Sequence, residues 1–131
     1  MKHSLILLIF AALMLGGCSK KEQSPEALAG QAAKAYYDRL LAGDYEGFLS
    51  GKAATDSLPD DYRAQLLISY KQYKKTLDEM HGGVASVTIS NTRNDSIMQM
   101  MQTFLLLNFK DSTKEEIIVP MVLEGAEWKM R

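Results

Sequence analysis

The 131-residue sequence has 15 lysine and arginine residues against 16 aspartate and glutamate residues, which gives a formal net charge of −1. This balance provides no basic face for nucleic acid, so we expect no nucleic-acid partner. Cys18 is the only cysteine, which excludes a disulfide within the chain.

The N-terminus has the layout of a secretory signal. Met1-Lys2-His3 is a short basic start, and an apolar run from Leu5 to Leu15 follows it. A charged start, about ten apolar residues and small residues at the end are typical of a signal peptide. A membrane-spanning helix needs roughly 20 apolar residues, so this run is too short to span. We predict that residues 1–17 are a signal peptide.

The apolar run ends with Leu15-Gly16-Gly17-Cys18, which resembles the lipobox of bacterial lipoproteins. The resemblance implies that Cys18 becomes the lipidated first residue of the mature protein, and residues 18–24 then form the anchor and its tether. Two or three acyl chains anchor a protein firmly, whereas one does so only marginally. A lipidated Cys18 leaves no thiol for catalysis or metal binding. By resemblance to sorting in Gram-negative bacteria, Ser19 favours the outer membrane.

The first half of the remaining chain has helical patterns. Ser24-Pro25-Glu26 supplies a capping serine, a proline suited to the first turn and an acid near the positive helix end. Gly43 is well placed to end this helix in a left-handed conformation. The expected apolar faces are Leu28, Ala32, Tyr36 and Leu40 in this helix, Tyr45, Phe48 and Leu49 in a brief helix over Asp44 to Leu49, and Tyr62, Leu66, Tyr70, Tyr73, Leu77 and Met80 in a third helix from Pro59 to Met80.

The second half has strand patterns with turn residues between them. The run from Ile97 to Phe109 contains good helix formers, which Asp95 would cap, but a following hairpin favours a strand. Pro120 has no N–H to donate, so it predicts an edge or a bulge in its strand. The expected strands are Val84–Ser90, Ile97–Phe109, Glu115–Leu123 and Trp128–Arg131, with Asn91–Asp95 as a turn.

Three helices followed by a four-stranded antiparallel meander make an α+β plan, with residues 25–131 as a single domain. Several features of this region point to one family: Ala35-Tyr36-Tyr37, Leu40 to Tyr45, His81-Gly82-Gly83, Val119 to Leu123 and Glu127-Trp128-Lys129. They resemble the small bacterial lipoproteins of unknown function in the nuclear transport factor 2-like superfamily, whose fold is cystatin-like. The resemblance implies a curved sheet wrapped around helices, often with a conical pocket, and it implies no reaction.

Aromatic residues are the candidates for a ligand site. Tyrosines suit the wall of a pocket, because a few polar groups within an apolar surface fix the orientation of a ligand. The same spacing also suits a core, and core packing is the main alternative. The candidate pocket residues are Tyr36, Tyr45, Phe48, Tyr70, Tyr73, His81 and Trp128.

His81 is the one histidine beyond the signal segment, and it is close in sequence to Asp78 and Glu79. It would be half of an acid–base pair at a pocket mouth, or a cation at the end of a helix. We favour the helix-end interpretation, because no matched second residue is evident. Met98, Met100 and Met101 form a cluster that would suit Cu(I), but methionine is also a common filler of cores, and we favour packing.

Three triplets, Asp56-Ser57-Leu58, Asp95-Ser96-Ile97 and Asp111-Ser112-Thr113, resemble an envelope O-glycosylation signal of one Gram-negative lineage. Asp-Ser pairs also occur at turns for ordinary hydrogen-bonding reasons. The sequence leaves both interpretations open.

The sequence contains no phosphate loop, nucleophile elbow or metal-binding motif. We therefore expect a membrane-anchored, non-catalytic domain that binds a small ligand or an envelope protein, without a cofactor or a metal. One alternative is an enzyme that uses His81 as acid or base in a conical pocket. The other is a structural module that forms a homodimer through its sheet face, for which the apolar stretch from Met98 to Leu107 is suited.

Overall fold

A computed structural model describes residues 23–131 of the chain. The predicted signal peptide and Cys18 lie outside these residues. The helical half contains α2 (Pro25–Leu41), α3 (Tyr45–Ser50), the short 3₁₀ turn η1 (Thr55–Ser57) and α4 (Asp60–Glu79). The other half contains β1 (Val84–Asp95), β2 (Met100–Phe109), β3 (Lys114–Glu124) and β4 (Glu127–Met130).

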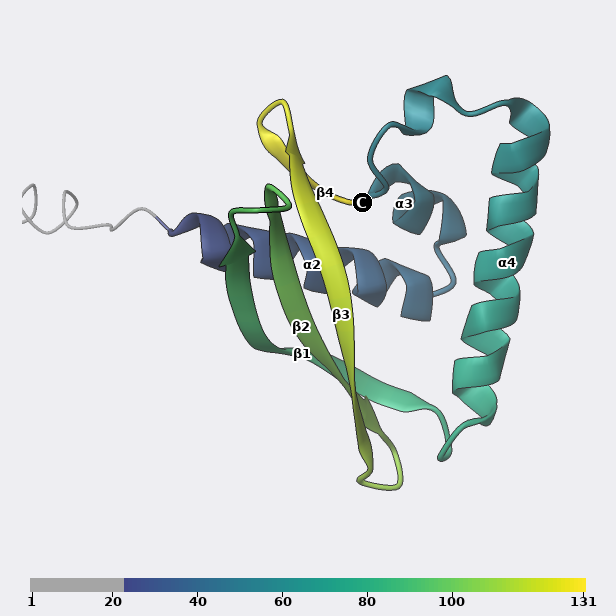
Figure 1. Ribbon diagram of the computed structural model, residues 1–131. Helices are drawn as coiled ribbons and strands as arrows, with labels where there is room; N and C mark the ends of the chain where they lie inside the picture. The colour runs from purple at the N-terminus through teal and green to yellow at the C-terminus, as the bar shows by residue number, and fades with distance from the viewer. Residues whose placement is uncertain (1–22) are drawn as a thin grey trace, which may run out of the picture.

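The four strands form one antiparallel sheet in the order β1-β2-β3-β4, so each strand pairs with its neighbours in sequence. Figure 1 shows that α2 crosses one face of the curved sheet and that α4 stands to one side of the sheet, where it contacts α3 and α2. The predicted plan of three α-helices packed on a four-stranded antiparallel sheet is confirmed for the described residues. The turn η1 was not predicted.

The helix boundaries follow from local hydrogen bonds. The Ser24 hydroxyl accepts a 3.1 Å hydrogen bond from the Ala27 amide at the start of α2, as predicted. Gly43 follows α2 with a φ of +83°, the left-handed conformation expected of it. Asp44 then caps α3, because its carboxylate accepts a 2.9 Å hydrogen bond from the Gly47 amide.

The predicted turn at Asn91–Asp95 is wrong, because these residues continue β1. A register shift between Ile89 and Asn91 places one extra residue in the strand, and the remaining residues pair with the start of β2. This long pairing satisfies the backbone groups of the polar residues. The turn lies at residues 96–99 instead, where the Asp95 carboxylate accepts a hydrogen bond from the Met98 amide, and β2 begins at Met100 rather than at Ile97.

The core lies between α2 and the inner face of the sheet. Alternate residues of β2 are buried on this face, and small residues of α2 bring the helix close to the strands. Gly30 of α2 lies so near β1 that an added Cβ would be 2.9 Å from the Thr92 methyl group. The buried residues include Ala29, Ala33, Leu40, Met101, Thr103, Leu105, Leu107, Phe109, Val119 and Met121.

The opposite face of the sheet carries no helix within the described residues (Figure 1). Phe104 and Leu106 of β2 are half-buried on this face, and Ile118 of β3 is 59% exposed. Pro120 lies at the side of β3 that faces β4, where its carbonyl accepts a 3.0 Å hydrogen bond from the Arg131 amide. β4 pairs only with residues 121–124 of β3, so Pro120 is the first residue beyond this pairing. Its missing N–H predicted such a position at a strand edge.

Candidate functional site

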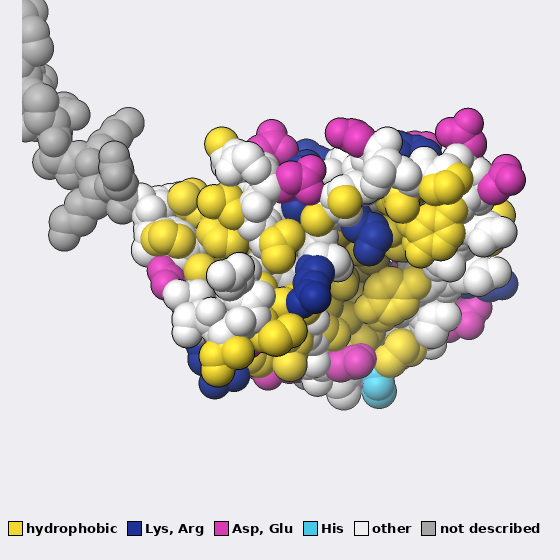
Figure 2. Space-filling view, turned by 45° about the horizontal axis from the view of Figure 1, so that its top comes forward, with side chains coloured by type: hydrophobic (Ala, Val, Ile, Leu, Met, Phe, Trp, Pro, Cys, Tyr) yellow, Lys and Arg dark blue, Asp and Glu magenta, His cyan; other side chains and the backbone are white. Residues whose placement is uncertain are grey.

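A cavity of about 190 Å³ lies where α2, α3 and α4 approach the edge of β3, and we call it the tyrosine cleft. Figure 2 shows the hollow between the sheet and α4, with hydrophobic side chains along its walls. The residues that line the cleft are Tyr37, Phe48, Lys52, Tyr70, Ile118, Val119, Pro120, Met130 and Arg131.

Three rings from three helices form the aromatic wall of the cleft. Phe48 of α3 lies edge-on to Tyr37 of α2, with ring centroids 5.2 Å apart and an interplanar angle of 87°. It makes a similar contact with Tyr70 of α4, at 4.8 Å and 85°. Such edge-to-face pairs are favourable beyond the area they bury. Phe48 therefore packs against both tyrosine rings.

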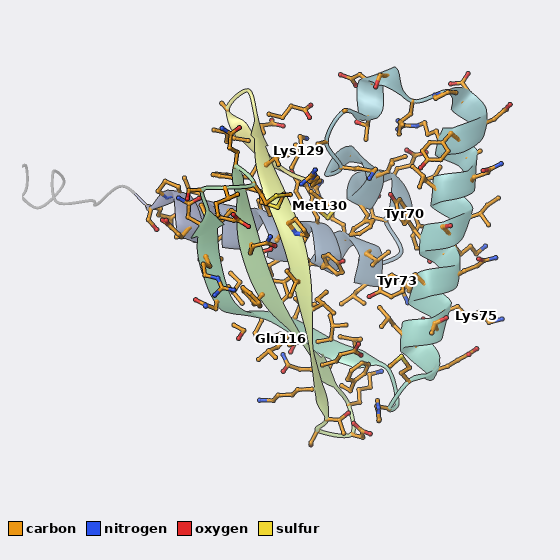
Figure 3. The ribbon with its side chains drawn as sticks, viewed as in Figure 1. Tyr70, Tyr73, Lys75, Glu116, Lys129 and Met130 are labelled. Carbon is orange, nitrogen blue, oxygen red and sulfur yellow. The ribbon has the colours of Figure 1, made fainter. Side chains whose placement is uncertain are left out.

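The tyrosine hydroxyls give this apolar cleft its polar groups. Burial raises the pKa of Tyr37 above its usual value, and the nearby Tyr73 and Tyr70 raise it further. Burial also raises the pKa of Tyr70 and of Tyr73, and Glu115 adds to the effect at Tyr73. Figure 3 shows Tyr70 and Tyr73 extending from α4 toward the sheet. Within residues 23–131, these three hydroxyls make no hydrogen bond to protein.

Two cations complete the lining. Lys52 is in the segment after α3, which makes a parallel bridge to Met130 at the end of β4. In the described part of the chain Lys52 has no ion-pair partner. The Arg131 guanidinium lies 4.0 Å from the Met100 sulfur. The cleft therefore combines aromatic rings, hydroxyl donors and positive charge.

The seven predicted pocket residues do not all lie in one pocket. Phe48 and Tyr70 line the tyrosine cleft. Tyr73 is close enough to Tyr37 to raise its pKa, but it is not among the residues that line the cleft, and it is 37% exposed. Tyr45 lies over the outer surface of α4, beside Ile68 and Lys71.

Tyr36 and Trp128 meet on another side of α2. The Tyr36 hydroxyl donates a 2.8 Å hydrogen bond to the Trp128 carbonyl. The Arg39 guanidinium and the Lys129 ammonium lie 5.8 and 6.0 Å from the centre of the Tyr36 ring. The hydrogen bond and the Lys129 contact tie α2 to β4, so the Tyr36 side chain has a structural role here. Tyr36 and Trp128 also line a separate hollow of about 510 Å³ on this side of the molecule.

His81 follows the end of α4 and lies outside the residues that line the tyrosine cleft. Its Nδ1 is 2.9 Å from the Asp111 carboxylate in the β2–β3 turn, and its ring packs against Phe109. Hydrogen bonds from the Thr113 hydroxyl and amide lower the pKa of Asp111, and His81 lowers it further. These contacts join the end of α4 to a hairpin turn.

Sequence reasoning did not place Tyr37, Lys52 or Arg131 in the candidate pocket. Tyr36 rather than its neighbour Tyr37 was predicted for the pocket, but adjacent helical residues point about 100° apart. That rotation turns Tyr37 toward Phe48 and Tyr36 toward Trp128. Lys52 and Arg131 are in irregular segments, where no periodic pattern reveals their neighbours.

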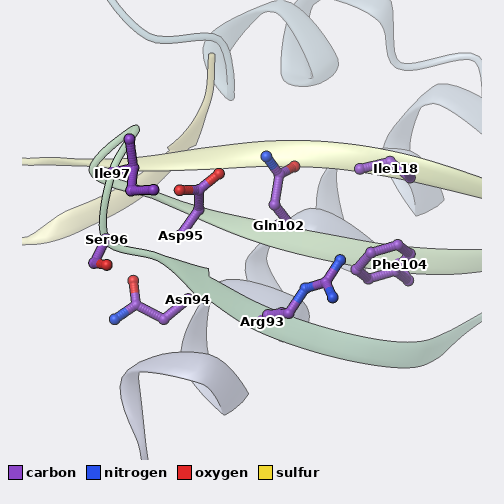
Figure 4. Close-up of a pocket in the computed structure, with 8 residues that line it drawn as sticks. All are labelled: Arg93, Asn94, Asp95, Ser96, Ile97, Gln102, Phe104 and Ile118. Atoms are coloured by element: carbon purple, nitrogen blue, oxygen red, sulfur yellow. The ribbon is translucent and has the colours of Figure 1, made fainter.

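A second hollow, of about 600 Å³, lies on the open face of the sheet (Figure 4). Arg93 extends over the Phe104 ring there, with its guanidinium carbon 5.6 Å from the ring centre. Met100 and Met101 are buried, as the packing interpretation predicts, whereas Met98 is exposed in the turn. Among residues 23–131, no three histidine, cysteine or acidic side chains come together as a metal site.

No family model matches this sequence, and no curated protein matches it. Among solved structures, the fold is similar to that of a Campylobacter jejuni protein whose name assigns it provisionally to the NTF2-like transpeptidases, with a TM-score of 0.56. The alignment covers 82% of this chain and 97% of that chain, at 17% identity. The chain therefore has a nuclear transport factor 2-like α+β fold, as the resemblance implied. At this identity the likeness shows the fold alone.

Proposed function

We propose that this chain is a lipid-anchored protein of the bacterial envelope that binds a small ligand in the tyrosine cleft. One observation carries the proposal. Three tyrosine hydroxyls meet in or beside an apolar cleft, and within the described residues they have no protein partner. Tyr37 and Tyr70 are only half-buried, and their hydroxyls are not among the fully buried, unpartnered polar atoms of the described residues, so they reach water at the cleft. A ligand with acceptor atoms would replace this water and accept their hydrogen bonds.

The cleft also defines the chemistry of the ligand. An apolar cavity of about 150 Å³ can hold a benzene molecule, and the tyrosine cleft measures about 190 Å³. Edge-to-face contacts with Phe48 and Tyr70 suit a planar ring, and Lys52 suits an anionic substituent. The expected ligand is a monocyclic aromatic molecule, or an aromatic side chain of a larger one, with a carboxylate or a similar acidic group.

Binding is favoured over catalysis by the position of the histidine. The enzyme hypothesis required His81 as an acid or base within the pocket, but His81 pairs with Asp111 away from the cleft. The cleft itself contains phenols with raised pKa values, which stay protonated near neutral pH and suit hydrogen-bond donation. The domain is accordingly proposed as a binding module, without a cofactor.

A structural role is the second candidate, and the open sheet face favours it. Ile118 is 59% exposed next to Phe104 and Leu106, which would form the centre of an interface between two copies. Sedimentation velocity over a wide concentration range tests this homodimer. A protein that stays monomeric at high concentration, with the same profile as Ile118→Lys, would rule it out.

The anchor is proposed from the lipobox at Cys18, and Ser19 favours the outer membrane. No helix within residues 23–131 is both long enough and apolar enough to span a bilayer. Intact mass of the protein extracted from bacterial membranes tests the anchor. A chain that begins at Cys18 and carries diacylglycerol and an acyl group is expected, and a chain that retains Met1 without lipid would contradict it.

Calorimetric titration tests the cleft. We expect 4-hydroxybenzoate to bind and the uncharged 4-hydroxybenzyl alcohol to bind at least about fivefold more weakly, since the alcohol cannot pair with Lys52. Tyr70→Leu should weaken binding, whereas Tyr62→Leu is the matched control on the same helix, because Tyr62 lies outside the cleft. Equal binding by both variants would contradict the assignment of the site.

A further inference from the structure

The turn between β1 and β2, residues 96–99, presents apolar side chains to solvent, and we call it the hairpin tip. Ile97 is 91% exposed, the highest value of any large hydrophobic residue in the described chain, and Met98 is 53% exposed. The Asp95 carboxylate accepts a 3.1 Å hydrogen bond from the Met98 amide, and Gln99 has a φ of +53°. These features hold a turn in which Ile97 and Met98 stay away from the core.

The hairpin tip lies at the end of the domain where α2 begins. Gly30 of α2 packs directly against Thr92 of β1. From this contact, α2 extends back about 9 Å to Ser24 at 1.5 Å per residue. In β1 the chain continues about 10 Å to Asp95 at 3.3 Å per residue. Figure 1 shows the start of α2 and the β1–β2 turn at the same end of the molecule, and Figure 4 places this helix beneath Asn94 and Ser96.

The distance from the predicted lipid to this end of the domain is short. Six chain steps separate Cys18 from Ser24, and even a fully extended chain covers only about 21 Å over that length. The surface around Ser24 is therefore held close to the bilayer whenever the anchor is inserted. Figure 2 shows hydrophobic side chains gathered on the surface beside the start of the described chain.

We infer that the hairpin tip is a second membrane contact, in which Ile97 and Met98 enter the interfacial layer of the bilayer beside the lipid on Cys18. The inference rests on the proposed lipid anchor. Arg93 stands four residues before Ile97 and has no ion-pair partner within residues 23–131, so it can meet phosphate groups behind the tip.

This second contact fixes the orientation of the domain. An anchor at Cys18 alone would leave the domain free to rotate, whereas two contacts hold one end against the lipid. Figure 1 shows α4 at the end of the molecule remote from the start of α2. With the hairpin tip in the bilayer, α4 and the tyrosine cleft that it borders therefore face away from the membrane, open to a soluble ligand.

The test places a tryptophan at the tip and measures its quenching by lipids brominated in the acyl chains. Met98→Trp is made in the full-length chain with Trp128→Phe, so that one tryptophan reports. Ile68→Trp in the same background is the control, because Ile68 is 59% exposed on α4. The vesicles contain phosphatidylethanolamine and phosphatidylglycerol. If mass shows that Cys18 carries no lipid, its free thiol is coupled to a maleimide lipid, so the tip is tested even when the proposed anchor fails.

We expect the brominated lipids to reduce the emission of Met98→Trp at least about twofold and to leave the emission of Ile68→Trp nearly unchanged. Adding Ile97→Asp should restore most of the emission of the tip tryptophan. Quenching at the tip no greater than that in the control would overturn the inference. A blue-shifted but unquenched tip tryptophan would overturn it in favour of a protein partner or a second copy. A sugar on Ser96 of the native protein would also overturn it, because a glycan keeps the tip in water.

Discussion

Tyr36 and Tyr37 are adjacent in α2, but their hydroxyls occupy different environments. The Tyr36 hydroxyl donates a hydrogen bond to the Trp128 carbonyl, whereas the Tyr37 hydroxyl lies in the tyrosine cleft without a protein partner among the described residues. This difference separates a group that holds the fold together from a group that is available to a ligand.

The first prediction compares Tyr36→Phe with Tyr37→Phe. Tyr36→Phe should lower the free energy of unfolding by about 0.5–1.5 kcal/mol, because it removes a hydrogen bond between α2 and β4. Tyr37→Phe should change it by less than about 0.5 kcal/mol or raise it slightly, because no bond is lost. Urea denaturation measures both values. A larger loss in Tyr37→Phe would show that its hydroxyl is satisfied within the protein.

The second prediction concerns alkaline pH. The pKa of Tyr37, Tyr70 and Tyr73 is raised in the folded protein. Their contribution to the free energy of unfolding is therefore complete below the unfolded pKa of about 10. This contribution is lost as the pH rises from about 10 toward the raised pKa values of the folded protein, because the unfolded chain ionises first. Melting temperatures should therefore decrease above about pH 10, and less steeply in Tyr37→Phe. Phenolate absorbance should show part of the tyrosines titrating late.

The third prediction concerns the contact between Gly30 and Thr92. In an exposed helix, Gly→Ala stabilises by about 1 kcal/mol. Here the new methyl group would lie 2.9 Å from the Thr92 Cγ2 and 3.3 Å from an Ile89 methyl, so Gly30→Ala should instead destabilise by about 1–3 kcal/mol. Thr92→Ser makes room, and the double variant should recover part of the loss. Additive effects in this double-mutant cycle would show that the two residues do not contact each other.

The fourth prediction concerns acid pH and Asp111. Its pKa is lowered in the folded protein by hydrogen bonds from Thr113 and by His81. The contribution of this carboxylate to the free energy of unfolding is therefore present above the unfolded pKa of about 3.9. It is lost as the pH falls through the lowered pKa of the folded protein. The melting temperature of the native sequence should decrease more between about pH 5 and pH 2 than that of Asp111→Asn. Parallel curves would show that these hydrogen bonds do not form in solution.

Sequence patterns predicted the helices and the order of strands well, because caps and periodic faces are local properties. Ser24, Gly43 and Pro120 each act as their chemistry predicted. The turn after β1 was misplaced because Asn91 to Asp95 are typical turn residues in isolation. In the structure, their pairing partners across the sheet keep them in a strand.

The candidate site was predicted only in part. Phe48 and Tyr70 line the cleft, but Tyr36 and Trp128 belong to a contact on another side of α2. Apolar periodicity identifies the inward face of a helix without identifying its neighbours. Because Tyr36 and Tyr37 both lie on the broad apolar face of α2, only the placement of α3 and β4 determines which of them reaches the cleft.

The most direct test of ligand binding in the tyrosine cleft is an NMR titration that follows the aromatic ring signals as 4-hydroxybenzoate is added. We predict that the signals of Tyr37, Phe48 and Tyr70 shift together with one binding curve, while those of the exposed Tyr62 remain in place. Cleft signals that do not move up to the solubility limit of the probe, or shifts confined to residues outside the cleft, would contradict ligand binding at this site.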